Sequence, residues 1–288
     1  MPPQPPAARN MPDRDARRKF RNRRRRRRLQ TLLTLSPWVI GSVAVAVGLL
    51  WLLRDLSPNW PPGGEIGLAN NDIVGNALQT LGTVYAVLLG FVVMAVWGQF
   101  NDARASVERE ANAIADLHRV LAGLPGEEAA HARDDLRAYL RGVLDEEWDA
   151  MRLGDHSATL ALSADLEMVW RDIRNMPLDD DLARSYHFEA LGRFNDLSDA
   201  RAERLRTGQI RIPFALRAVL YLGAVTTVGA MYLLHVESFG IHACTTGALA
   251  GAIAHVMYVV EDLDSAFTGD WRIEPEPLER LEEHLDGA

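Results

Sequence analysis

The chain has 288 residues, of which 48% are apolar and 24% charged, and its net charge is −8 at pH 7. The apolar residues are concentrated in four blocks, 37–53, 73–98, 212–234 and 239–260. Each block is long enough, or nearly so, to cross a hydrocarbon layer of about 30 Å as a helix with charges only at its flanks. This distribution excludes a wholly soluble protein and predicts an all-α membrane protein with four transmembrane helices.

The net charge hides a basic beginning and an acidic remainder. Residues 1–36 carry +10 and the rest of the chain carries −18. Lys and Arg beside a membrane helix resist translocation, so we expect both termini on the cytoplasmic side of the cell (inner) membrane. The Arg-rich tail also suits anionic lipid headgroups. Six consecutive arginines suggest nucleic-acid binding as an alternative, but no aromatic residues are interleaved with them, so no nucleic-acid partner is expected.

The pattern divides the chain into eight segments. They are a disordered basic tail (1–28), transmembrane helix 1 (29–53), an external loop (54–72), transmembrane helix 2 (73–100), a cytoplasmic helical domain (101–211), transmembrane helices 3 (212–234) and 4 (239–260), and an acidic cytoplasmic C-terminal segment (261–288). A cleaved signal peptide is the alternative for the first helix, but no A-x-A-like cleavage site follows it.

The region between the second and third spans has helical periodicity and no alternating β pattern. Three helices are expected after Pro125 and Gly126, and the region is predicted to form an antiparallel helical bundle. Their apolar faces comprise Leu136, Tyr139, Leu140, Val143, Leu144 and Trp148, then Leu160, Leu166, Val169, Trp170 and Ile173, and finally Leu182, Tyr186, Leu191, Phe194 and Leu197.

The second span is the centre of the expected architecture. It carries no charge between Asp72 and Asp102 and continues without proline into a charged helical pattern. One face, polar at its outer end and apolar midway, supplies the pore-lining candidates Asn76, Thr80, Thr83, Val87, Phe91, Met94 and Trp97. The same polar groups serve equally well for bonding between packed helices. Small residues that permit close helix packing are Gly82, Ala86 and Gly90 here, and Gly247 and Gly251 in the fourth span.

Few other residues suggest chemistry. His255 is an ionisable group inside the fourth span, where such a group is by default a functional candidate; a neutral imidazole bonded to a neighbouring helix is the alternative. The carboxylates after this span offer hard oxygen ligands to calcium, although an acidic turn at the membrane surface explains them too: Glu261, Asp262, Asp264 and Asp270. No catalytic signature occurs, so an enzyme is not expected and no cofactor other than calcium is considered.

Three segments together resemble a known family. They are Tyr85-Ala-Val-Leu-Leu-Gly-Phe91 followed by Trp97, Phe100, Val107 and Glu110-Ala-Asn112; Ala200-Arg201-x-x-Arg204 before Pro213; and Leu263-Asp264-x-x-Phe267-x-Gly269. This combination resembles an uncharacterised, bestrophin-like family of bacterial membrane proteins, a domain of unknown function.

The resemblance implies a function class. Bestrophins are pentameric anion channels whose second membrane helix lines the pore and whose acidic loop after the membrane clasps calcium. By similarity the chain is expected to be a homo-oligomeric ion channel with residues 76–97 along its pore. It departs from the family at Ala266, where proline is usual, and in an aromatic constriction reduced to Phe91 and Tyr85. The alternative is a non-conducting scaffold or sensor whose cytoplasmic domain binds a partner.

Overall fold

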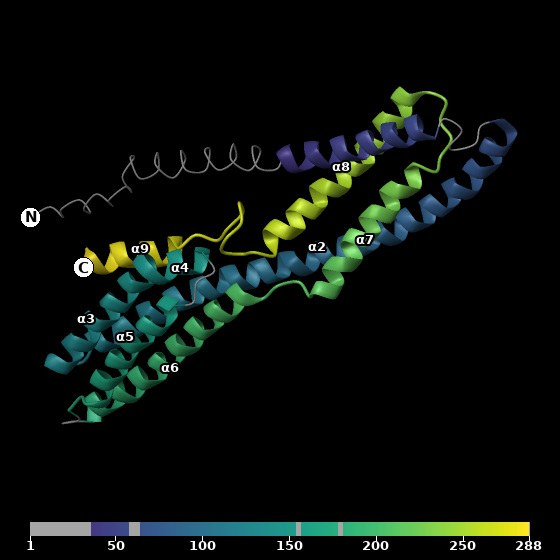
Figure 1. The fold of residues 1–288 in the computed structure, drawn as a ribbon. Helices are drawn as coiled ribbons and strands as arrows, with labels where there is room; N and C mark the ends of the chain where they lie inside the picture. Colours follow the sequence, from purple (N-terminus) through teal and green to yellow (C-terminus); the bar gives the residue numbers. More distant parts are fainter. Residues whose placement is uncertain (1–35, 58–63, 154–156, 178–180, 288) are drawn as a thin grey trace, which may run out of the picture. The chain divides into compact units, whose positions relative to one another are not determined.

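A computed structural model of the chain describes residues 36–57, 64–153, 157–177 and 181–287 (Figure 1). Every regular element within these residues is a helix. After the first helix, Ser36–Leu56, come α2 (Gly64–Ala122), α3 (Glu127–Gly142), the π-helical turn η1 (Val143–Glu147), α4 (Trp148–Leu153), α5 (Ser157–Arg174), α6 (Asp181–Gln209), α7 (Phe214–Met231), α8 (Phe239–Leu263) and α9 (Glu276–Asp286). The predicted basic tail, 1–28, lies outside the described residues.

Four helical stretches of the described residues are long and apolar enough to cross a membrane. They are Ser36–Leu56, Asn70–Ala122, Asp181–Met231, which contains α6 and α7, and Phe239–Leu263. The predicted all-helical chain with four candidate membrane-spanning helices is therefore confirmed. The side of the membrane on which each loop lies stays a prediction.

The chain forms two compact units, of which the first comprises Met1–Val74 and Ala230–Tyr258. In it the first helix packs closely on α8, because α8 presents glycine at the contact. A Cβ atom on Gly251 would lie 3.1 Å from Cγ2 of Val43. The Tyr232 hydroxyl also donates to the carbonyl oxygen of Ala46, at 3.1 Å.

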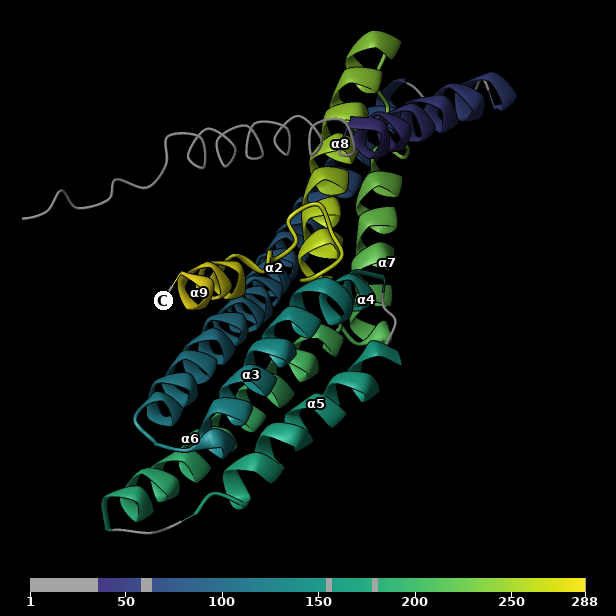
Figure 2. The same cartoon turned by 90° about the vertical axis from the view of Figure 1, so that its left-hand side faces the viewer.

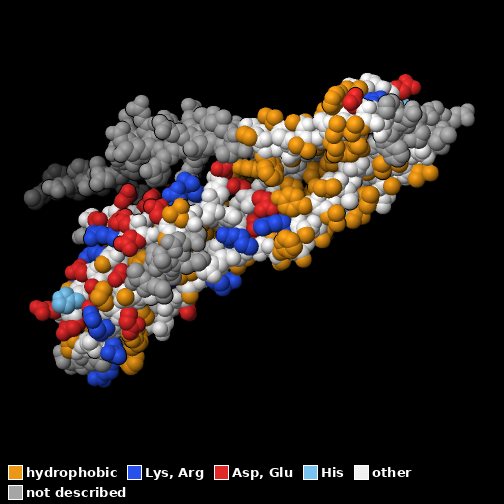
Figure 3. Space-filling model, viewed as in Figure 1, with side chains coloured by type: hydrophobic (Ala, Val, Ile, Leu, Met, Phe, Trp, Pro, Cys, Tyr) orange, Lys and Arg blue, Asp and Glu red, His pale blue; other side chains and the backbone are white. Residues whose placement is uncertain are grey.

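The second unit, Gly75–Gly229 and Val259–Ala288, contains a large apolar core. The C-terminal half of α2 lies alongside α3, α5 and α6 in both views (Figures 1 and 2). Charged side chains gather on the surface over these helices, whereas apolar side chains cover the visible face of α7 (Figure 3). Fully or almost fully buried core residues are Ile114, Leu117, Leu121, Leu136, Tyr139, Leu140, Val143, Val169, Ile173 and Leu197.

The predicted apolar faces of α3 and α5 are the buried ones, apart from Leu160, whose side chain lies outside the described residues, but α6 differs at its beginning. Leu182 is 65% exposed and Tyr186 is also exposed, whereas Phe194 and Leu197 are buried. The apolar period of α6 therefore faces the core from Ala190 onward and not at the start of the helix.

The C-terminal segment contains a helix that the sequence analysis did not separate from its acidic surroundings. Leu278, Leu281 and Leu285 recur at three- and four-residue steps, and α9 packs them on the core of the second unit. Pro277 lies in the first turn, where its missing N–H costs nothing, and Glu276 and Glu279 suit the helix dipole there. Amphipathicity therefore folds this segment despite its acidity.

Candidate functional site

The seven pore-lining candidates all lie on an exposed side of α2. Phe91 and Met94 are 71% and 70% exposed, and the others are exposed as well. The hydroxyl of Thr80 donates to the carbonyl oxygen of Asn76 at 3.0 Å, and that of Thr83 to Gln79 at 2.8 Å. Their protons are thus bound within the helix. Lining of a pore by this face stays a prediction.

The small residues of α2 and α8 have different surroundings. Apart from the backbone of α2 itself, no described atom lies within 4 Å of a Cβ placed on Gly82 or Gly90, and Ala86 is exposed. A Cβ on Gly247 would lie 3.3 Å from Val43, so Gly247, like Gly251, lies against the first helix. The α8 glycines therefore pack within the protomer, whereas Gly82 and Gly90 of α2 contact no neighbouring helix among the described residues.

The glycine that brings α2 and α7 together is one that sequence reasoning missed. A Cβ on Gly223 would lie 2.4 Å from Cδ2 of the Tyr85 ring, and the Tyr85 hydroxyl donates to the carbonyl oxygen of Leu220 at 3.0 Å. Only glycine leaves room for the ring at this point. A lone glycine in an apolar run gave no signal of its partner.

His255 is exposed on α8 and has no hydrogen-bond partner among the described residues. The buried histidine of this helix is instead His242, whose Nε2 lies 2.8 Å from the carbonyl oxygen of Met231. The functional role of His255 stays a prediction.

Three of the four acidic candidates after α8 have side chains engaged by other parts of the chain, and Asp264 and Glu261 share Arg217. Asp264 accepts hydrogen bonds from the backbone N–H of Ile212 (2.7 Å) and from Arg217 (2.6 Å). Asp262 accepts the N–H groups of Asp270 (2.6 Å) and Trp271 (2.9 Å), which closes the loop on itself.

Glu261 completes this set, because its carboxylate lies 3.2 Å from Nε of Arg217. No group of three potential ligands able to hold a metal ion occurs among the described residues. Calcium binding by this loop therefore stays a prediction, and the present contacts of its carboxylates do not fit a calcium site.

A buried ionic network was not anticipated from the sequence. The Arg204 guanidinium of α6 bridges two carboxylates, Glu110 of α2 and Glu147 at the end of η1. Arg201 donates to Glu147 at 2.8 Å, and the Tyr139 hydroxyl donates to Glu110 at 2.6 Å. Both glutamates and Arg204 are fully buried. Two positive and two negative charges balance, which is the condition for burying them.

The surroundings of Tyr139 in this network change the pKa of its hydroxyl. Burial raises the pKa of its hydroxyl well above the ordinary 10, and the adjacent Glu110 carboxylate raises it further. The phenol therefore keeps its proton and donates it to Glu110. The ring also lies beside the guanidinium of Arg201, which is 5.8 Å from its centroid.

The three segments that carry the family resemblance meet at this network. Glu110 belongs to the first, Arg201 and Arg204 to the second, and Phe267 of the third packs edge-on against Trp148, with ring centroids 5.5 Å apart. Arg204 in turn lies 5.9 Å from the Trp148 ring centroid. These segments therefore maintain one structural centre rather than three separate sites.

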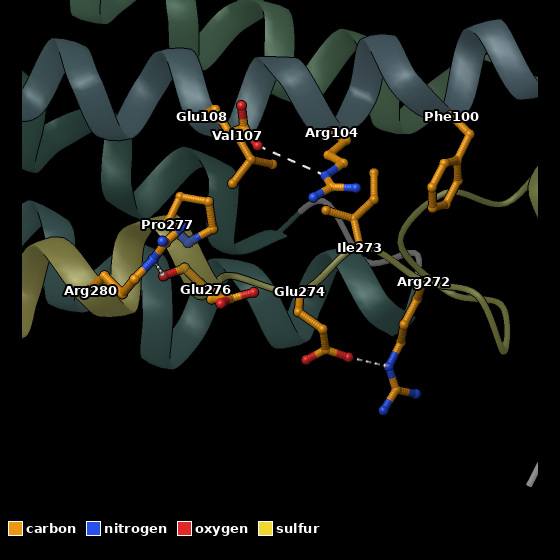
Figure 4. Close-up of a pocket in the computed structure, with 10 residues that line it drawn as sticks. All are labelled: Phe100, Arg104, Val107, Glu108, Arg272, Ile273, Glu274, Glu276, Pro277 and Arg280. Atoms are coloured by element: carbon orange, nitrogen blue, oxygen red, sulfur yellow. Dashed lines mark hydrogen bonds and ion pairs between the residues drawn. The ribbon is translucent and has the colours of Figure 1, made fainter. Parts of the chain in front are cut away.

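Among the hollows that the described residues of the second unit form, two are lined largely by charged side chains. The first, of about 180 Å³, lies between α2 and the C-terminal segment and is shown in Figure 4; its lining residues are Phe100, Arg104, Val107, Glu108, Arg272, Ile273, Glu274, Glu276, Pro277 and Arg280. The second, of about 500 Å³, is an open groove lined by α2 and α6 residues that include Arg109, Asp116, Asp196 and Glu203.

Comparisons with known proteins agree with the resemblance. The Bestrophin-like domain profile matches residues 40–278. A crystal structure of a bacterial bestrophin homologue from Klebsiella pneumoniae is 18% identical and aligns over 86% of this chain and 97% of that one, with a TM-score of 0.64. Two point mutants of that homologue align similarly, at 18% identity, 86% and 98% coverage and TM-score 0.64, and at 15%, 88% and 98% and 0.66. No curated protein matches the chain significantly.

Proposed function

We propose, on the premise that this chain belongs to the Bestrophin-like domain family, that it is an oligomeric ion channel of the bacterial inner membrane. It is a membrane protein, and the bestrophin family is known as channels rather than enzymes. The conducted ion is expected to be a small anion.

The observation that carries the proposal is the exposed stripe of α2. Polar Asn76, Thr80 and Thr83 lie at one end and apolar Val87 and Phe91 follow midway, all of them unburied in the protomer. A ring of such helices would surround a path with a wide polar mouth and an apolar constriction that gates by dewetting. In this arrangement residues 101–211 form a cytoplasmic helical domain, and both termini are cytoplasmic.

The test is ion flux through proteoliposomes containing the full-length chain. Truncating the constriction with Phe91→Ala should change the anion flux at least severalfold. The matched control is Val225→Ala on α7, which is equally exposed and apolar but lies outside the stripe. Absence of flux at every voltage and pH, or a monomer in membranes, would contradict the channel.

A second candidate is the non-conducting scaffold or sensor. The observation that favours it is the charged groove of about 500 Å³ between α2 and α6, which could receive a partner protein. Deleting residues 120–205 should then abolish partner capture in a pull-down but leave membrane insertion intact. A chain that conducts ions with the Phe91 dependence described above would favour the channel instead.

A further inference from the structure

Four basic side chains from three helices gather at one corner of the second unit. His118 lies on α2, Arg133 and Arg137 lie on α3, and His284 lies in the last turn of α9. Burial lowers the pKa of the His118 imidazole below its ordinary 6.5, and the positive charges of the other three groups lower it further. His118 therefore faces positive charge from both of the helices that pack beside it.

The two arginines of this corner are one turn apart, so their side chains share a face of α3 and repel each other. Nη1 of Arg137 donates to Asp134 at 3.0 Å, but this carboxylate is 71% exposed and such surface pairs are weak. Arg133 is half-buried and forms neither an ion pair nor a hydrogen bond within the described ranges. The described part of the chain thus leaves positive charge on this face.

The acidic helix α9 does not supply the missing carboxylate. Its ion pairs to α3 are made at Arg141, where Glu282 and Asp286 lie 3.7 and 2.9 Å from the guanidinium. The α9 group that acts on His118 is instead His284, a further base. These two carboxylates are therefore engaged one turn away from Arg137, and α9 adds positive charge to the corner.

Three nitrogen atoms of this corner are buried and lack a partner. They are Nε2 of His118, Nε of Arg133 and Nε of Arg137, and none has a hydrogen-bond acceptor among the residues that the structure describes. Buried polar atoms are nearly always paired, and a bound ion or water is a usual reason for an exception. The terminal nitrogens of Arg133, unlike its Nε, are open to the solvent, so a ligand from solution would contact them first.

The corner lies well beyond the membrane-spanning part of α2. His118 is about 24 Å further along the helix than Asp102, the first charged residue after the apolar run. The headgroup layer of a bilayer is only about 5–8 Å deep on each side. A ligand of this corner therefore comes from the aqueous phase and not from the lipid.

We propose that this corner binds the phosphate group of a soluble anion, with Arg133 and Arg137 as its main contacts and His118 and His284 beside them. A guanidinium presents paired N–H groups that match two oxygens of a phosphate, a fit that chloride cannot offer. A doubly charged anion would also offset the repulsion between the two arginines. The site does not depend on conduction, so its failure would leave the channel proposal untouched.

The test is isothermal titration calorimetry of the full-length chain in detergent with inorganic phosphate, sulfate and chloride, at an ionic strength held constant with gluconate. Phosphate and sulfate should bind severalfold more tightly than chloride. Arg133→Gln removes a charge-assisted contact and should weaken sulfate binding by about tenfold. Arg184→Gln is the matched control, since Arg184 is an exposed arginine that pairs with Asp181 at the start of α6, and it should change nothing.

The pH dependence of sulfate binding tests the part played by the histidines. Sulfate keeps both charges between pH 6 and 8, and the two arginines do not titrate there. A bound anion raises the pKa of a neighbouring imidazole, so by linkage sulfate should bind more tightly as pH falls from 8 to 6. His118→Gln should reduce this dependence, and combining it with His284→Gln should abolish it. A pH profile that the double variant leaves unchanged would contradict the assignment of the histidines.

The stability of the arginine variant provides an independent check. Without phosphate or sulfate, Arg133→Gln removes an unneutralised charge, so its melting temperature should equal that of the unmodified chain or exceed it. A lower melting temperature would show that Arg133 has a structural partner and would overturn the proposal. Equal affinities for chloride and sulfate, undiminished sulfate binding by Arg133→Gln, or displacement of sulfate by phosphatidic acid in the micelle would overturn it too, the last by showing that the ligand is a lipid.

Discussion

The two halves of α2 share one helical backbone but place their apolar residues in opposite ways. Before Asp102, Leu81 and Val84, which are not among the pore-lining candidates, are 48% and 65% exposed. After it, Ile114 and Leu117 are fully buried, and even Glu110 is fully buried against Arg204. In lipid an outward apolar side chain costs nothing, whereas in water it must find a core. The surrounding solvent, and not the helix, therefore decides which face packs.

The largest expected effect on stability comes from a buried charge in the helices that pack on α2 after Asp102. Glu147→Ala leaves Arg204 and Arg201 without their shared carboxylate and should lower the free energy of unfolding by about 3–5 kcal/mol. Urea unfolding followed by tryptophan fluorescence measures it. Glu146→Ala, at the exposed neighbouring position, should stay within about 0.5 kcal/mol. Equal effects of the two substitutions would show that the network does not stabilise this domain.

A smaller effect is expected where the apolar half of α2 meets α7. Gly223→Ala places a methyl group against the Tyr85 ring and should destabilise the protein by about 1–3 kcal/mol, because overpacking displaces a fixed neighbour. Thermal unfolding in detergent is the measurement. Gly229→Ala on the same helix, with no described atom within 4 Å, should be neutral or slightly stabilising. A neutral Gly223→Ala would mean that this contact is loose.

A slight gain in stability is expected when the Asp135 carboxyl of α3 is replaced. Burial, and then the charge of Asp172, raise the pKa of Asp135 above its ordinary 3.8, while Arg171 and His131 partly oppose them. A raised pKa means that the folded chain binds this proton more tightly, so its contribution is greatest below pH 3.8 and is lost as pH rises through the folded pKa.

Asp135→Asn should therefore raise the free energy of unfolding at pH 7 by less than about 0.5 kcal/mol, which appears as a slightly higher melting temperature. This gain should vanish near pH 3. Melting curves across this pH range provide the test. Asp134→Asn is the control, since Asp134 pairs with Arg137 at 3.0 Å and its loss should bring no gain. A gain that persists in acid would contradict the assignment.

The smallest effect on stability is expected at the exposed stripe of α2. Phe91→Ala should leave the melting temperature in detergent unchanged, because the ring makes little contact within the protomer. The same variant is expected to alter ion flux, as described above. A large loss of stability would instead show that Phe91 packs in the assembled protein and would sharpen the contrast between the two halves of α2.

Periodicity and hydropathy were sufficient for part of this structure. Uncharged runs predicted the spans, and the three- and four-residue recurrence of Leu136, Tyr139 and Leu140 predicted a buried face, because both signals are local. The ionic network could not be predicted in this way, since Arg204 and Glu110 are 94 residues apart in the chain. The acidic residues after α8 suggested a metal site. Their partners, such as Arg217, could not be foreseen because they lie on an element far away in the sequence.

The pairing of Glu110 with Arg204 also has a consequence for synthesis of the chain. Arg204 follows Glu110 by 94 positions, which take roughly 5–20 s to translate at about 5–20 residues per second. Throughout that interval Glu110 has no counter-ion from α6, so the apolar face around it cannot close without burying a lone charge. The part of α2 after Asp102 must therefore stay unpacked during translation, after its membrane half has been inserted, until Arg201 and Arg204 have been synthesised.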